Sequence, residues 1–187
     1  MKKLIINLGF RLFLVCAVAA IALGFTYSVV EKRIAAQASK RSSDAALNVF
    51  ASIKAEPQED LDLTATLQGT YPDLIDVFKG LNGNGDISGY AFILKSKGYN
   101  FITMAVGVDS NGKVTGIKIV TNEETPGLGA VAAENPTFLD QFNGKGPDPL
   151  VLKKDVDAVT SATYTSRGIT NGVNMALDIW NHIRQNG

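Results

Sequence analysis

Hydroxyl-bearing side chains gather at residues 157–166, which read DAVTSATYTS. Asp157 is the only charged residue of this stretch, and Arg167 follows it directly. Downstream, apolar residues recur at i, i+4, i+7 and i+8 from Ile169, which predicts an amphipathic helix over residues 165–185. A helix amino terminus has unpaired N–H groups and a positive dipole end, so it binds phosphate readily. Two interpretations stay open: an ordinary helix cap by Thr165 or Ser166, or a phosphate-linked ligand site.

A second candidate stretch lies upstream, where residues 122–129 read NEETPGLG. Pro126, Gly127 and Gly129 interrupt any regular element and predict a sharp turn. Such a turn can expose backbone N–H and C=O groups to a flat ligand. Glu124 is either a solvated charge or part of that binding surface.

The elements that must position these residues include a group of strands in the centre of the chain. Residues 89–96, 99–109 and 113–122 are rich in β-branched and aromatic residues, which is typical of strands. The Asn-Gly pair at 111–112 predicts a hairpin between the last two. We also expect short helices from Ala130 and over PTFLDQF, and strand character over 150–160. The fold class is therefore α+β, an antiparallel sheet packed with helices. The aromatic residues of the strands, Tyr90, Phe92, Tyr99 and Phe101, are expected to pack rather than to contact a ligand.

The amino-terminal region carries a candidate membrane segment. Residues 12–30 contain no charged side chain, and their length is close to the ~20 residues that a membrane-spanning helix needs. A cleaved signal peptide is the alternative, but its Ala-x-Ala triplet at Ala20–Ala22 lies in the middle of the apolar run rather than at its polar end. We therefore expect a transmembrane helix over 12–30. The tail before it, 1–11, has no acidic residue, which favours a cytoplasmic amino terminus.

The rest of the chain would then be extracytoplasmic, in the periplasm if the cell is Gram-negative. Residues 31–56 are rich in alanine and charge and predict a helical stalk that Pro57 ends. Residues 57–187 would form the folded domain, carried on the cell (inner) membrane by a single span.

Composition excludes several function classes. The 18 basic residues are balanced by 18 acidic ones, so there is no basic surplus of the kind that nucleic-acid binding needs. The single cysteine, Cys16, falls in the apolar run and allows neither an internal disulfide nor a cysteine cluster. The single histidine, His182, has no nucleophile elbow to accompany it. We assign no catalytic residue and no metal site.

The two candidate stretches resemble one known family. DAVTSAT resembles the Asp-x-x-Ser/Thr-Gly-Ala-Thr signature of FMN-binding domains in the G subunit of Rnf electron-transport complexes, a signature shared with the C subunit of sodium-translocating NADH:quinone reductases. NEETPGLG resembles the Glu-Thr-Pro-Gly-Leu-Gly stretch of the same family. The resemblance spans most of residues 1–185, and the short chain is more similar to the Rnf-type subunit. Ser161 is a departure, since glycine is usual at that position.

The resemblance implies FMN bound covalently, through a phosphoester to Thr163. It also implies a separate magnesium-dependent flavin transferase, which uses FAD as donor and releases AMP, with Asp157 serving recognition by that enzyme. The residues expected to contact the cofactor around the attachment point are Thr160, Ser161, Ala162, Thr165, Ser166 and Arg167. The second motif is expected to line the isoalloxazine ring or ribityl chain with Glu124, Thr125, Gly127 and Leu128.

The implied function is a membrane-anchored flavoprotein electron carrier. In an Rnf-type complex, electrons move between ferredoxin and NAD, coupled to translocation of sodium ions or protons. This chain has no dinucleotide fingerprint and no iron–sulfur cysteines, so it would be one relay among other membrane subunits and not catalytic alone. Two alternatives remain: a non-redox membrane-tethered ligand-binding or sensor module, and a stand-alone flavoprotein reductase.

Overall fold

The computed structural model describes residues 2–186, without the side chains of residues 2–8, 28, 29, 32 and 35. The chain divides into two compact units, one up to Lys40 and one from Arg41 onward. The two units are described separately below.

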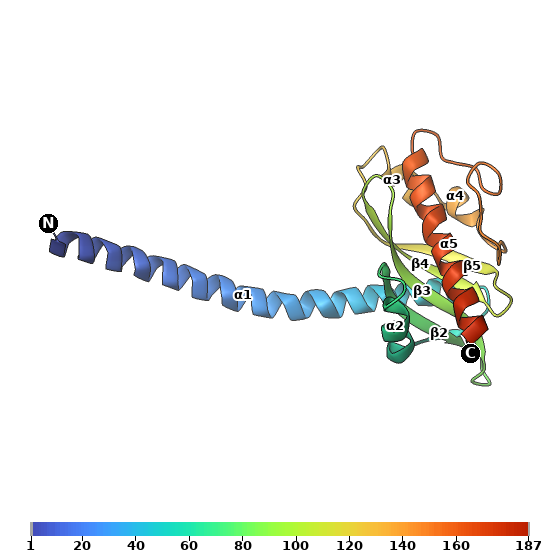
Figure 1. The fold of residues 1–187 in the computed structure, drawn as a ribbon, viewed down its shortest axis with the longest axis horizontal. Coiled ribbons are helices and arrows are strands. Elements are labelled where there is room, and N and C mark those ends of the chain that lie inside the picture. Colours follow the sequence, from blue (N-terminus) through green and yellow to red (C-terminus); the bar gives the residue numbers. More distant parts are fainter. Residues whose placement is uncertain (1, 187) are drawn as a thin grey trace. The chain divides into compact units, whose positions relative to one another are not determined.

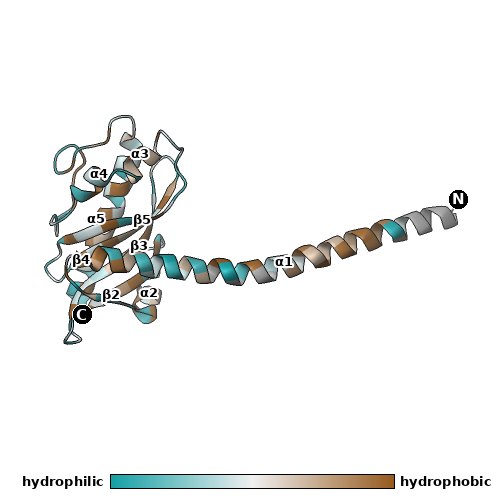
Figure 2. Cartoon of the chain, turned by 180° about the vertical axis from the view of Figure 1, so that it is seen from behind, coloured by the Kyte–Doolittle hydropathy of each residue, from teal (hydrophilic) through white to brown (hydrophobic). Residues whose placement is uncertain are grey.

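The first unit is helical over its described residues, 2–40. Helix α1 runs from Lys2 to Phe50, so the predicted membrane segment and most of the predicted stalk form one continuous helix. Its stretch from Gly9 to Tyr27 has a mean hydropathy of 2.0 over 19 residues, and Figure 2 shows it as a mostly brown, apolar length of helix. This helix is long and apolar enough to cross a membrane.

The predicted end of the stalk helix is wrong by several residues. Helix α1 ends at Phe50, followed by a turn in which Lys54 has a φ of 52°. Pro57 does not end the helix, because it already lies in strand β1, Glu56–Glu59.

The second unit is built on one five-stranded sheet (Figure 1). The other strands are β2 (Leu74–Leu81), β3 (Ile87–Lys97), β4 (Phe101–Asp109) and β5 (Val114–Asn122), in the order β1-β2-β3-β4-β5. All neighbours are antiparallel. The predicted meander is thus confirmed for β3, β4 and β5, while β1 and β2 were not predicted. At the Asn-Gly turn, the Asp109 carboxylate accepts the backbone N–H groups of Asn111 and Lys113.

Helix α5, Thr163–Asn186, packs along one face of the sheet against β3 and β4 (Figure 1). Its apolar stripe, which includes Ile169, Val173 and Leu177, meets Phe92 and Met104 in the main core. The predicted terminal helix is confirmed and begins two residues earlier than expected. The sheet therefore fixes where the first turn of α5 lies.

The opposite face of the sheet is covered by the last turns of α1. Ala45, Ala46, Val49 and Phe50 form a second core cluster with sheet residues that include Phe78 and Ile93. The Thr115 hydroxyl donates to the Val49 carbonyl over 2.6 Å. Residues 41–50 therefore belong to the folded unit.

Three short helices complete the unit: α2 (Leu61–Gln68), α3 (Ala130–Ala133) and α4 (Pro136–Asp140). The last two confirm the helices expected after Ala130. The predicted strand over 150–160 is wrong, because only a single bridge joins Leu152 to Val156. Lys153 between them has a left-handed φ of 69°, a conformation that interrupts an extended strand.

Candidate functional site

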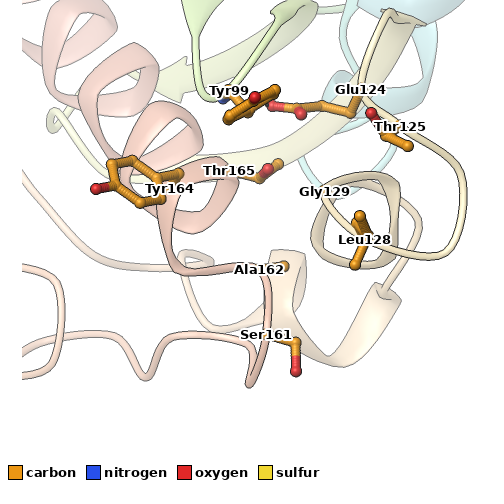
Figure 3. Close-up of a pocket in the computed structure, with 9 residues that line it drawn as sticks. All are labelled: Tyr99, Glu124, Thr125, Leu128, Gly129, Ser161, Ala162, Tyr164 and Thr165. Carbon is orange, nitrogen blue, oxygen red and sulfur yellow. Dashed lines mark hydrogen bonds between the residues drawn. The ribbon is translucent and has the colours of Figure 1, made fainter.

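A pocket with a cavity volume of about 280 Å³ lies where three segments of the second unit meet. They are the turn between β3 and β4, the loop after β5 and the start of α5. The residues that line it are Tyr99, Glu124, Thr125, Leu128, Gly129, Ser161, Ala162, Tyr164 and Thr165 (Figure 3). The two motifs singled out in the sequence therefore meet at one cavity.

Glu124 is the most unusual group in the wall of this pocket, because it is only 5% exposed. Its Oε1 accepts the backbone N–H of Tyr99 over 2.9 Å, which ties the β3–β4 turn to the loop after β5. Its Oε2 is buried and has no hydrogen-bond partner within the part of the chain that the structure describes. A buried acceptor left unpaired costs about 1–3 kcal/mol, so this oxygen indicates a ligand with a hydrogen-bond donor.

The surroundings of that carboxyl leave no room for larger residues. A methyl group on Gly129 would collide with Glu124 Oε2 and with the Thr165 hydroxyl, and one on Gly98 would collide with Glu124 Oε1. Thr165 itself is buried. The β3–β4 turn, the loop after β5 and the first turn of α5 are therefore in close contact around Glu124.

Thr163 is the first residue of α5, at the edge of this pocket, and is half-buried. Its neighbours Ala162 and Tyr164 both line the cavity. The first turn of this 24-residue helix contains no acidic residue. No carboxylate there neutralises the positive end of the helix dipole, which stays available to a bound anion. The start of α5 is therefore a place where an anionic group such as a phosphate is stabilised.

The predicted helix caps are wrong. Thr165 and Ser166 lie inside the first turn and are buried. The Ser166 hydroxyl donates to the Ala162 carbonyl over 3.0 Å and accepts the Val159 N–H over 3.1 Å. Ser166 thus fixes the loop that enters α5 and does not face the pocket.

Ser161 lines the pocket with a left-handed backbone, φ 69°. This conformation is comfortable for glycine and costs other residues roughly 1–2 kcal/mol. The geometry therefore supplies a physical reason for the glycine that is usual in the resembling signature.

The remaining candidate residues lie outside the pocket lining. Asp157 and Thr160 are exposed on the loop before α5, and Gln141 holds the Asp157 backbone by accepting its N–H over 2.7 Å. Arg167 is exposed, with its guanidinium carbon 5.8 Å from the centre of the Tyr164 ring. Gly127 has a φ of 76° and allows the turn that follows Pro126.

Sequence reasoning missed Tyr99, Tyr164 and Gly129 as pocket residues. Tyr99 was expected to pack in the sheet, and this is wrong, because it lies in the β3–β4 turn and is 72% exposed. The Asn-containing turn signal at residues 98–100 was available in the sequence, but nothing there showed which other segment this turn would meet. In the described residues, no group of three or more His, Cys, Asp or Glu side chains could hold a metal ion.

Comparison with known proteins agrees with this site. Residues 98–178, which include every residue of the pocket lining, match the FMN-binding domain family. The second unit therefore contains an FMN-binding domain.

The whole chain is similar to particular members of that class. It is 32% identical over 197 residues to the G subunit of the Na(+)-translocating ferredoxin:NAD(+) oxidoreductase complex of Acetobacterium woodii, covering 97% of this chain and 94% of that protein. It is 39% identical over 110 residues to the G subunit of the proton-translocating ferredoxin:NAD(+) oxidoreductase complex of Clostridium ljungdahlii, covering 55% and 58%. The crystal structure of Shewanella oneidensis NqrC aligns with a TM-score of 0.49 and 26% identity over 59% of this chain and 61% of that one. The chain belongs to the family of G subunits of ion-translocating oxidoreductase complexes, which confirms the resemblance.

Proposed function

We propose that this protein is a membrane-anchored flavoprotein subunit that relays electrons through FMN attached covalently to Thr163. The complex would be of the Rnf type and would move electrons between ferredoxin and NAD while it translocates an ion. The family membership and the FMN-binding domain support this proposal. The proposal goes beyond these two findings in three respects: the covalent bond, the relay role and the partner subunits.

The observation that carries the proposal is the unpaired Glu124 Oε2 in the wall of the pocket beside the start of α5. An isoalloxazine ring carries an N–H donor, and a ribityl chain carries hydroxyl donors, so FMN offers what this oxygen lacks. The pocket volume of about 280 Å³ is near the lower end for small-molecule sites. It suits one flat ring system, with the phosphate end reaching the helix terminus.

Each pocket segment has a distinct role in this proposal. Thr163 supplies the hydroxyl oxygen that forms the new P–O bond, while the pyrophosphate bond of FAD breaks, AMP leaves and the hydroxyl proton passes to solvent. The positive end of the α5 dipole and the Arg167 guanidinium stabilise the remaining negative charge of the diester. Thr125 and Leu128 line the ring or ribityl chain from the loop after β5. When bound, FMN supplies the one- and two-electron chemistry.

The exposed loop before α5 suits recognition by a separate flavin transferase. Asp157 and Thr160 are exposed there, while the backbone of Asp157 is held by Gln141. We infer that this segment and the exposed Ser161 form the surface the transferase approaches, and that the small side chain of Ala162 leaves the neighbouring Thr163 hydroxyl accessible.

The location follows from α1. In this proposal, the apolar stretch Gly9–Tyr27 stays uncleaved as the anchor in the cell membrane, and the second unit lies on the extracytoplasmic side. A covalent bond suits a carrier there, because a dissociating cofactor would be lost by dilution. The names of the two bacterial relatives cite a sodium ion in one case and a proton in the other. We therefore propose one of these two ions as the coupling ion.

The test is expression with a flavin transferase in a bacterial host, followed by denaturation. We expect the denatured band to fluoresce under ultraviolet light and the peptide 155–167 to carry one FMN group in place of a proton. Thr163→Val should abolish both signals without unfolding the domain, because the half-buried side chain keeps its shape. Thr66→Val is the matched control, since this exposed threonine lies in α2, outside the pocket lining and outside the loop before α5, and it should retain the flavin.

A wild-type protein that stays bare in the presence of an active transferase would contradict the covalent relay. Reversible binding of a ligand by that protein would then favour the sensor module. Purification of a flavin-loaded protein without any partner subunit would instead favour the stand-alone reductase.

A further inference from the structure

We propose that Tyr99 and Tyr164 are the stacking residues of this pocket and hold a flat aromatic ring by contact with its faces. This inference rests on the proposed function, since the ring would be the isoalloxazine of FMN. Neither tyrosine belongs to the two motifs that the family resemblance rests on.

The first reason is the exposure of the two rings. In the second unit, Phe50, Phe78, Phe92, Phe138, Phe142 and Trp180 are at most 4% exposed. Tyr99 is 72% exposed and Tyr164 is 69% exposed, while the next most exposed aromatic, Phe101, reaches 39%. The two most exposed aromatic rings of this unit therefore line the same cavity. Exposed apolar surface gathered at one place is typical of a binding site.

The second reason is that the backbones beneath both rings are fixed. The Tyr99 N–H is held by Glu124 Oε1 over 2.9 Å, and the turn is closed by the Gly98 N–H, which donates to the Asn100 carbonyl over 2.9 Å. A methyl group on Gly98 would lie 2.9 Å from the Thr165 Cα atom. The turn that carries Tyr99 thus touches the helical turn that carries Tyr164, so the spacing of the two ring bases is set before any ligand binds.

The third reason is the position of the rings around the cavity. In Figure 3, Tyr164 and Leu128 lie at opposite sides, and Tyr99 lies beside Glu124 along a third side. Tyr164 follows the proposed attachment residue directly, and the Arg167 guanidinium carbon lies 5.8 Å from the centre of its ring. A ring system tethered at Thr163 would reach both phenols and bury surface that is now in water.

A fluorescence series tests this role. An electron-rich phenol in contact with an excited isoalloxazine quenches its emission, and a phenyl ring does so far less. Tyr99→Phe and Tyr164→Phe should therefore raise the emission yield of the loaded protein several-fold while the visible circular dichroism of the flavin is kept. Tyr99→Leu and Tyr164→Leu should raise the emission and also change the circular dichroism, because the stacked ring is gone.

Tyr90→Phe is the matched control. Tyr90 lines a different cavity with Trp180 and Arg184, near the carboxyl end of α5, and its substitution should leave the flavin emission unchanged. Emission equal to wild type in all four pocket variants would overturn the inference, while retention of flavin in those proteins would leave the proposed function standing. A wild-type protein that binds no flavin would overturn the proposed function instead.

Chemical nitration gives an independent measurement. In wild-type protein made without the transferase, Tyr99 and Tyr164 should be nitrated faster than the half-buried Tyr90. In loaded protein both should be protected several-fold. Equal nitration of the two tyrosines with and without FMN would contradict the stacking role.

Discussion

Ser161 shows how a single residue can carry strain at the edge of a binding pocket. Its φ of 69° lies in a region that β-carbons disfavour, and the serine hydroxyl makes no hydrogen bond that compensates within the described residues. The side chain is exposed, so a change there disturbs no packing. Position 161 therefore isolates the backbone effect.

We predict that Ser161→Gly raises the free energy of unfolding by about 0.5–1 kcal/mol. The relief of roughly 1–2 kcal/mol of left-handed strain is partly offset by the greater freedom of glycine in the unfolded chain. Urea unfolding of the protein without flavin measures this. Ser161→Ala keeps the β-carbon and should give no gain, so an equal gain in both variants would contradict the strain.

At the same scale, the sequence predicted part of the site for a clear reason. Thr163 and Glu124 lie in motifs whose residues are close together in the chain, so these motifs can be recognised from the sequence alone. The tertiary contacts of Glu124 could not be predicted from the sequence, because Tyr99 and Thr165 are 25 and 41 positions away from it in the chain. Whether Glu124 was a solvated charge depended on that tertiary contact, and the structure buries it.

At the scale of helices and strands, the elements with a regular residue pattern were the ones that the sequence predicted. Strands β3, β4 and β5 carry long β-branched runs and an Asn-Gly turn, and they formed as expected. Helix α2 has only eight residues, and β2 is interrupted by irregular register with β3 at two places, so neither shows a clean period. The segment 150–160 had the composition of a strand, but the left-handed Lys153 breaks it.

A charge pair with a pH-dependent effect on stability joins the start of α2 to strand β2. Asp60 caps α2 by accepting the Leu63 N–H over 3.0 Å, and its other oxygen lies 2.5 Å from Lys79 Nζ. The hydrogen bond from Lys79 is the main cause that lowers the pKa of Asp60, and burial opposes it. A lowered carboxyl pKa stabilises the fold above the ordinary value near 4, and this contribution is lost as pH falls through the folded-state pKa.

We therefore predict that Asp60→Asn, which keeps a capping oxygen and loses the ion pair, lowers the free energy of unfolding at pH 7 by about 0.5–1 kcal/mol, the scale of partly exposed pairs. The difference from wild type should shrink as pH falls below about 4. Urea unfolding followed by Trp180 fluorescence at several pH values measures it. Asp73→Asn removes a charge from an exposed position in the turn between α2 and β2, outside this ion pair, and a loss of the same size and pH profile there would contradict the assignment.

For the molecule as a whole, α1 has two consecutive parts of different character. Its residues Gly9–Tyr27 have the length and hydropathy of a membrane span, and its residues 41–50 are part of the folded unit. From sequence, a domain beginning at 57 was predicted, since Pro57 looked like the natural boundary. That boundary remains a prediction, and the packing of Val49 and Phe50 indicates where to test it.

We predict that a chain truncated to begin at Arg41 keeps the unfolding transition of the full-length second unit, whereas one that begins at Pro57 loses it. The second truncation removes Phe50, which is fully buried against Gly80, and loss of one buried phenylalanine alone costs about 3–5 kcal/mol. Typical domains have about 5–15 kcal/mol in total, and removing Ala45, Ala46 and Val49 as well leaves Phe78 and Ile93 uncovered. Near-ultraviolet circular dichroism and thermal unfolding of both truncated chains measure the difference, and Phe50→Ala in the full chain gives the single-residue value. If the chain from Pro57 unfolds at the same temperature as the chain from Arg41, the last turns of α1 are only a connector, and the boundary lies where the sequence pattern predicted it.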